Sequence, residues 1–174
     1  MAGGRGPAYW NRMNLYLIRH ADAGDPLHWD GDDADRPLTD LGRNQVRALG
    51  AAFQQRGIAL DALLTSPLTR TVQTAGEFRE ALGAGPDPTA LDLLAPDELR
   101  RRKLTKHVAG LGVGSVALVG HNPDLSAYLG WLLGIDPAQV ELVKGGAALV
   151  TFEDDPAKGE GVLEWLITPT WYGG

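Results

Sequence analysis

Apolar runs alternate with amphipathic stretches from residue 14 to about residue 135. Residues 15–18 and 115–119 have the nearly continuous apolar character of strands that are buried on both faces. A shorter run at residues 61–65 has the same character. Strands of this kind, separated by stretches with helical periodicity, predict βα units arranged around a mostly parallel sheet.

The first helix is predicted to begin after Thr39, whose hydroxyl is suited to cap its amino end. Val46, Leu49 and Phe53 recur at the spacing of one helical face. Gly42 shares that face, so we expect the helix to approach the sheet closely at this point.

Two strand-to-helix junctions have the same composition. Ser66 is predicted to cap a helix that Pro67 begins, and Asn122 to cap a helix that Pro123 begins. Arg70 lies about one turn inside the first of these helices and off its apolar stripe, which leaves the guanidinium for a polar role at the sheet edge. The predicted core stripe of that helix is Leu68, Val72, Ala75 and Leu82.

The segment between residues 91 and 111 predicts a short edge strand followed by a helix. The strand is expected at residues 91–94, and the helix is expected to open at Pro96-Asp97-Glu98. Its apolar face is Leu104, Val108 and Leu111.

The carboxyl-terminal part predicts a hairpin, because Ala147–Phe152 and Val162–Ile167 are strand-like runs on either side of a polar turn. The whole pattern predicts an α/β protein with a three-layer α/β/α sandwich. Its mixed sheet is expected to be mostly parallel, with the antiparallel hairpin at the carboxyl-terminal end.

The length of 174 residues and the hydrophobic content of 44% suit one core. Residues 1–12 are rich in Gly and polar groups and precede the first strand-like run. We therefore predict a flexible N-terminal extension over residues 1–12 and a single domain over residues 13–174.

Charge and composition narrow the possible partners. A formal net charge of −6 argues against nucleic acid as a partner, while a small phosphorylated ligand can still be bound by a locally positive pocket. The absence of cysteine excludes disulfides, thiolate nucleophiles and Cys-ligated metals. No apolar run suits a membrane span, so we expect a cytoplasmic protein without a membrane partner, whose oligomeric state the sequence leaves undetermined.

Two of the predicted buried strands are followed by histidines, His20 and His121. Since ligands of open α/β sheets bind beyond the carboxyl ends of the strands, we expect the two imidazoles to share one crevice. Arg19 and Arg70 add planar donors suited to a phosphoryl group, and the helix ends after Ser66 and Asn122 add partial positive charge. The set predicts a phosphoryl site.

Four ordered motifs resemble the histidine phosphatase superfamily, also called phosphoglycerate mutase-like, and within it the SixA-type phosphohistidine phosphatases. They are Leu-Ile-Arg-His-Ala-Asp-Ala at 17–23, Arg-Pro-Leu-Thr-Asp-Leu-Gly at 36–42, Ser-Pro-Leu-Thr-Arg-Thr-Val-Gln-Thr-Ala at 66–75 and Val-Gly-His-Asn-Pro at 119–123. The resemblance implies a metal-independent phosphatase without a cofactor.

The same resemblance implies a role for each matching residue. His20 is the expected nucleophile, which forms a covalent phosphohistidine intermediate that water then hydrolyses. Arg19 and Arg70 are expected to bind the phosphoryl oxygens, and His121 to donate a further hydrogen bond. Asn122 is a further expected substrate-binding residue.

Two departures from the larger family members bear on the substrate. Ala21 stands where those members carry Gly, so the turn after His20 is expected to keep a negative φ. They also carry a Glu acid in an inserted segment, for which this chain offers only Asp97 or Glu98. A phosphohistidine releases a nearly neutral imidazole and needs less proton donation than a phosphoester. The expected substrate is therefore a phosphorylated histidine-containing protein, or a related small phosphorylated compound.

Two other functions remain open from the sequence: a broad small-molecule phosphomonoesterase of the same superfamily, and a non-catalytic phosphoryl-binding module. Asp22 is counted among the substrate-binding residues, as a carboxylate that orients an arginine of the site, and the alternative is a solvated loop residue. His28, His107 and the acidic run 30–35 are interpreted as surface features. The basic run 100–103 is interpreted as a solvated face, with an acidic phosphoprotein as the alternative partner.

Overall fold

The computed structural model describes residues 12–173. Of the predicted extension over residues 1–12, all but Arg12 lies outside the described residues, so that boundary stays a prediction. Among residues 12–173, no helix is both long and apolar enough to cross a membrane.

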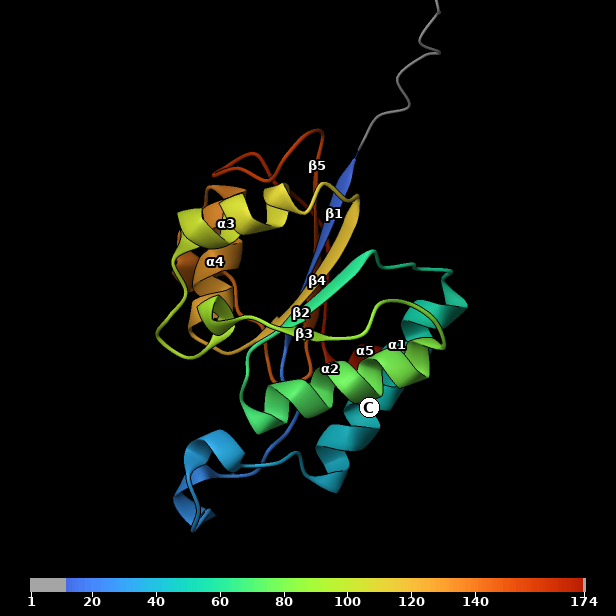
Figure 1. Ribbon diagram of the computed structural model, residues 1–174, viewed down its shortest axis with the longest axis vertical. Coiled ribbons are helices and arrows are strands. Elements are labelled where there is room, and N and C mark those ends of the chain that lie inside the picture. Colours follow the sequence, from blue (N-terminus) through green and yellow to red (C-terminus); the bar gives the residue numbers. More distant parts are fainter. Residues whose placement is uncertain (1–11, 174) are drawn as a thin grey trace, which may run out of the picture.

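A six-stranded mixed sheet with the order β3-β2-β4-β1-β5-β6 organises the described residues (Figure 1). The first four strands in this order are parallel, and β5 and β6 are antiparallel to their neighbours. This confirms the predicted sheet, and the bounds of the hairpin strands agree with the sequence pattern. The strands are β1 Met13–Arg19, β2 Ala62–Thr65, β3 Thr89–Ala90, β4 Ser115–Gly120, β5 Ala147–Phe152 and β6 Val162–Ile167.

Helices cover both faces of the sheet and make three layers (Figure 1). One face carries α1 Asp40–Gln55, α2 Thr69–Leu82 and the short α5 Pro169–Tyr172. The other carries α3 Arg101–Gly110 and α4 Asp124–Leu133. Short 3-10 turns lie in the connections, at Pro26–His28, Asp33–Asp35, Asp92–Leu94 and Pro137–Gln139.

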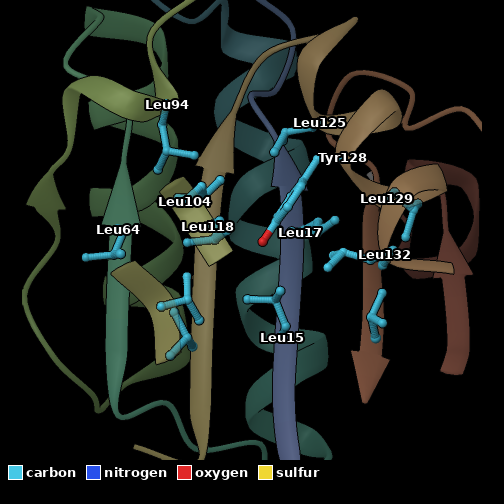
Figure 2. Close-up of a cluster of buried hydrophobic side chains, with 14 of the residues drawn as sticks. Leu15, Leu17, Leu64, Leu94, Leu104, Leu118, Leu125, Tyr128, Leu129 and Leu132 are labelled. Carbon is cyan, nitrogen blue, oxygen red and sulfur yellow. The ribbon is translucent and has the colours of Figure 1, made fainter. Parts of the chain in front are cut away.

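The strand β1 supplies both hydrophobic cores because successive side chains point to opposite faces. Leu15 and Leu17 pack with the residues of α3 and α4, as Figure 2 shows for that core. Tyr16 and Ile18 pack on the other side with the residues of α1 and α2. A central strand buried on both faces fixes the direction and height of Arg19 and His20, which follow at its end.

The start of α1 is as predicted. The Thr39 hydroxyl accepts a hydrogen bond from Gly42 N–H at 3.1 Å. A Cβ on Gly42 would lie 2.1 Å from the Asp22 carbonyl oxygen, so only glycine allows the helix to approach the chain that leaves His20.

The helix α2 begins later than predicted. Its first residue is Thr69, with Leu68 as the N-cap, so the prediction that Ser66 caps and Pro67 begins this helix is wrong. Val72, assigned to the core stripe, is 43% exposed. The inward face is partly polar instead, because the buried hydroxyls of Thr71 and Thr74 donate to backbone carbonyls of the same segment.

The segment before α3 also differs from the prediction. The edge strand is β3, Thr89–Ala90, and residues 92–94 form a 3-10 turn rather than a strand. The helix begins at Arg101 and not at residue 96. Asp97 has a φ of +64°, a left-handed conformation that an α-helix does not accommodate.

The helix α4 begins one residue later than predicted, with Pro123 as the N-cap and Asp124 as the first helical residue. Asn122 still satisfies a backbone donor near this end, because its side-chain oxygen accepts from Ser126 N–H at 3.3 Å. The start of the helix is therefore shifted by one residue from the prediction, and the side-chain amide of Asn122 still bonds to the first turn.

Candidate active site

The two histidines meet because their strands are adjacent and parallel. Arg19 at the end of β1 is in register with Gly120 at the end of β4, and His20 N–H donates to Gly120 O at 3.0 Å. The rings of His20 and His121 lie 5.2 Å apart between centroids. Ser66, which follows β2, joins the same edge through its N–H, which donates to Val119 O at 3.0 Å.

His20 is buried, with 6% of its surface exposed. Its Nδ1 lies 2.8 Å from Ala21 O, and a carbonyl only accepts, so Nδ1 carries the proton and Nε2 carries the free lone pair. Burial, together with the nearby cations Arg70, Arg19 and Lys144, lowers the pKa of His20 to about 4, against a hydrogen bond to Ala21 that raises it. The imidazole is therefore neutral and nucleophilic at physiological pH.

His121 is equally enclosed and is held by Ser66. Its Nε2 lies 2.8 Å from Ser66 Oγ, and burial, together with His20 and Arg70, lowers its pKa to about 3. When Ser66 donates this hydrogen bond, Nδ1 of His121 carries the ring proton and can donate it to a ligand. A Ser-Pro pair before a helix also has the signature of a cap, so this role of Ser66 was not predicted from the sequence.

Arg70 is buried and is held by the acidic loop, which is the segment after His20 that contains the acidic run 30–35. Its Nη1 donates to Asp33 O at 2.7 Å and its Nη2 to Asp33 Oδ2 at 3.0 Å. The other Asp33 oxygen accepts from Arg36 Nε at 2.8 Å, and Arg36 Nη1 donates to Ala23 O at 2.8 Å. Asp33 and Arg36 therefore connect the loop that leaves His20 to the guanidinium of Arg70. The prediction that this acidic run lies on the surface holds for Asp33, which is exposed, but no sequence motif indicated that its carboxylate also binds Arg70.

Arg19 is anchored at the opposite side of the site. Its Nη1 donates to Leu142 O at 3.0 Å, and Asn122 Nδ2 donates to the same carbonyl at 2.8 Å. The Asn122 side chain therefore positions the segment around Leu142, and its predicted contact with substrate stays a prediction. Among the described residues, the Nε atoms of Arg19 and Arg70 are buried donors without a partner, which an anion between the guanidinium groups would satisfy.

Asp22 does not contact either arginine, so the hypothesis that it orients one of them is wrong. Its carboxylate accepts from Thr39 Oγ1 at 2.7 Å and from Lys144 Nζ at 3.2 Å. The residue after Lys144, Gly145, donates its N–H to His20 O at 3.1 Å. Lys144 is a further cation near the site that no sequence motif indicated, because 122 residues separate it from Asp22.

The candidate acids lie on the surface. Asp97 and Glu98 are exposed. The backbone N–H of Asp97 donates to Asp124 Oδ2 at 2.9 Å, and its backbone carbonyl accepts from Arg100 Nη1 at 2.9 Å. In the part of the chain that the structure describes, neither carboxylate bonds to a histidine or arginine of the site. His28 and His107 are exposed, as predicted.

The depressed pKa values of His20 and His121 predict an unusual pH dependence. The acid limb of kcat/KM is expected near pH 4, because His20 stays unprotonated down to that value rather than to the ordinary 6.5. Stability follows the same window. Between about pH 6.5 and 4 for His20, and between about pH 6.5 and 3 for His121, the unfolded chain binds protons that the native state does not bind, so the free energy of unfolding falls as pH falls.

Titration of the imidazole protons by NMR, with His20→Ala and His121→Ala for assignment, measures both values directly. Midpoints near pH 6.5 for both rings would contradict the prediction.

Known proteins share this arrangement of motifs and strands. Residues 15–95 match the Histidine phosphatase superfamily (branch 1). An uncharacterised protein of Picosynechococcus is 33% identical over 91% of this chain and 98% of its own length. Phosphohistidine phosphatase SixA of Escherichia coli is 26% identical over 90% of this chain and 94% of its own. A solved structure of the protein histidine phosphatase SixA complexed with tungstate is 25% identical, covers 91% of this chain and 98% of that one, and superposes with a TM-score of 0.80. With its motifs, sheet order and full-length likeness in agreement, the chain belongs to the histidine phosphatase superfamily.

Proposed function

We propose that this chain hydrolyses phosphohistidine on a protein, by way of a covalent phosphohistidine intermediate at His20. Membership of the superfamily and the likeness to SixA make it a phosphatase, a hydrolase of a phosphorylated substrate. The observation that carries the proposal is the neutral His20 imidazole, whose free Nε2 shares a buried edge with Arg70 and His121.

In the first step, the Nε2 lone pair of His20 attacks phosphorus and the phosphorus–nitrogen bond of the substrate breaks. The departing imidazole leaves as a neutral ring when its other nitrogen carries a proton. Water then attacks the phosphoryl group on His20, the new phosphorus–nitrogen bond breaks, and phosphate leaves while a proton of the water passes to solvent.

Arg19 and Arg70 bind the phosphoryl oxygens and stabilise the charge that develops on them. His121 adds a hydrogen bond from Nδ1. A SixA protein that this chain resembles forms a complex with tungstate, an oxyanion similar to phosphate in shape and charge, and this supports an oxyanion as the ligand of this chain.

The carboxylates that touch the site favour a phosphoramidate over a phosphoester. Hydrogen bonds from Arg36 and the charge of Arg70 lower the pKa of Asp33, and hydrogen bonds from Thr39 and Lys144 lower that of Asp22 against a desolvation that raises it. Both are therefore ionised at neutral pH and cannot donate a proton to a leaving alkoxide. Phosphohistidine needs no proton from these carboxylates when its other ring nitrogen is already protonated.

The decisive experiment compares kcat/KM for a phosphohistidine protein with kcat/KM for sugar phosphates and phosphoglycerates. We expect the phosphoprotein to be preferred, and the acidic loop to contribute by repelling small polyanions, at up to about 1 kcal/mol per close exposed charge pair. Asp30→Asn, Asp32→Asn and Asp35→Asn together should narrow the gap. Asp33 is left unchanged in this variant because it holds Arg70.

Two results would replace the proposal. Sugar-phosphate hydrolysis at least as fast as phosphohistidine hydrolysis, and lost in Asp97→Asn with Glu98→Gln, would establish a phosphomonoesterase. Stoichiometric binding of the phosphoprotein without turnover would establish a phosphoryl-binding module.

Metal independence is a separate prediction. Fixed guanidinium groups do here what Mg²⁺ does in kinases, so activity is expected to survive exhaustive treatment with EDTA. Vanadate, which adopts the trigonal-bipyramidal geometry of phosphoryl transfer, is expected to inhibit. Activity that EDTA removes and Zn²⁺ or Mg²⁺ restores would show a metal centre instead.

A further inference from the structure

The segment around the start of α3 concentrates positive charge on an acidic protein. Five of the sixteen Lys and Arg residues lie between positions 100 and 106, and no Asp or Glu occurs from residue 99 to residue 123. All five residues are exposed to solvent. They are Arg100, Arg101, Arg102, Lys103 and Lys106.

These cations are not neutralised within the molecule. In residues 12–173, none of the five forms an ion pair, whereas the surface arginines Arg43 and Arg47 both pair with Glu77. The hydrogen bonds of Arg100 go to the carbonyls of Asp97 and Leu99 and not to a carboxylate. The charge is therefore available to a partner.

The positions of these cations also destabilise the helix α3. Arg101, Arg102 and Lys103 occupy the first turn of α3, where the helix dipole disfavours cations. That turn contains no acidic residue, and no side chain caps it. Arg102 and Lys106 are a like-charged pair at i and i+4, which destabilises a helix by about 0.2–0.5 kcal/mol. The basic run therefore does not serve to stabilise the helix. Sequence features that disfavour the local structure in this way often occur at functional segments.

The packing of α3 turns part of the run outward. Leu104 and Val108 are fully buried in the core beside α4, and Thr105 Oγ1 lies 2.8 Å from the hydroxyl of Tyr128 on that helix. At about 100° per residue, Arg102, Lys103 and Lys106 lie on the face opposite Leu104 and Val108. We call these three residues the basic face.

The basic face lies on the side of the sheet that carries α4, the helix that follows His121. Just before α3, Asp97 N–H donates to the carboxylate of Asp124, the first residue of α4. Figure 1 shows α3 beside α4, with the acidic loop, drawn in blue, at the other end of the molecule. Because Asp33 of that loop holds Arg70, the basic face lies away from the site, and a partner that contacts both has to extend along α4.

We propose that the basic face docks an acidic patch on the protein that carries the phosphohistidine. This inference rests on the proposed function, and it specifies that the protein substrate carries negative charge where it contacts the basic face. A bounded acidic patch suits the basic face better than a nucleic acid or an anionic membrane does, because the net charge of −6 and the acidic loop repel an extended polyanion.

The test uses three phosphohistidine peptides that differ only in a tail of eight Glu, eight Gln or eight Lys residues behind a flexible spacer. At low ionic strength the wild type is expected to show about tenfold higher kcat/KM for the Glu tail than for the Gln tail, mostly through KM. The preference should disappear in R102Q/K103Q/K106Q and in about 0.5 M NaCl. Phosphohistidine as the free amino acid should be turned over equally by both enzymes.

R47Q/R56Q/K158Q is the matched control. It removes three exposed cations outside the basic face, of which Arg47 lies on α1 and Arg56 directly follows that helix across the sheet, and it should keep the preference for the Glu tail. A wild type that treats the Glu and Gln tails alike, or a preference that survives in R102Q/K103Q/K106Q, would overturn the inference. The inference would also be overturned if R102Q/K103Q/K106Q, compared with wild type, lost more affinity for duplex DNA or for phosphatidylserine vesicles than for the Glu-tailed peptide.

Fluorescence anisotropy of the unphosphorylated Glu-tailed peptide separates the two proposals. Binding that depends on Arg102, Lys103 and Lys106, without turnover of any phosphohistidine peptide, would refute the proposed function and support an acidic partner. Turnover of phosphohistidine without any effect of tail charge would support the function and refute the docking surface.

Discussion

Replacement of His20 by alanine is expected to lower turnover of phosphohistidine by on the order of 10⁴-fold or more, because the variant has no nitrogen to accept the phosphoryl group. The fold should persist, since the backbone N–H of residue 20, which donates to Gly120 O, is retained. Wild type incubated with a radiolabelled phosphoryl donor should acquire a label that is labile in acid and stable in base, and the variant should not.

The control is His107→Ala, which changes an exposed histidine outside the site. Circular dichroism and thermal unfolding establish that the His20 variant is folded. A folded His20→Ala enzyme with normal turnover would eliminate the covalent mechanism, and label retained in that variant would assign the nucleophile to another residue.

Arg70→Lys is expected to lower kcat/KM by roughly 10²–10³-fold, although the formal charge is unchanged. An ammonium group cannot bond Asp33 and present a second planar edge to a phosphoryl group at the same time. The loss should appear mainly in kcat, because the contact strengthens as charge develops on the phosphoryl oxygens. Steady-state kinetics with a phosphohistidine substrate, at matched thermal stability, measures it.

Asp33→Asn tests how Arg70 is held, with Asp35→Asn as the control, because that exposed neighbour makes no side-chain contact recorded among the described residues. A moderate fall in kcat for Asp33→Asn alone, of roughly three- to thirtyfold, is expected if Asp33 positions the guanidinium. A lower KM in Asp33→Asn would show instead that this carboxylate competes with the phosphoryl group. An Arg70→Lys enzyme as active as wild type would exclude Arg70 from the site.

The sequence determined the layers and the edge at which the site lies. The continuous apolar run Leu15-Tyr16-Leu17-Ile18 predicts a strand buried on both faces, and since successive side chains of a strand point to opposite faces, the residues on each face of β1 were readable without coordinates. The pairing of His20 with His121 was readable for a related reason. The carboxyl ends of parallel strands lie at the same edge of a sheet, and this holds for the strands before His20 and His121 although the two residues are 101 positions apart.

Only the tertiary structure decided which side chains hold these groups in place. Ser66 had the local signature of a helix cap, but the imidazole of His121 bonds to its hydroxyl across 55 residues of sequence. Asp33 was one of several acids in the loop, and its contact with Arg70 spans 37 residues. Lys144 reaches Asp22 across 122. Periodicity and strand direction are properties of local backbone geometry and can be read from a sequence. The partner of a loop side chain depends on where distant segments pack, and no local pattern specifies that.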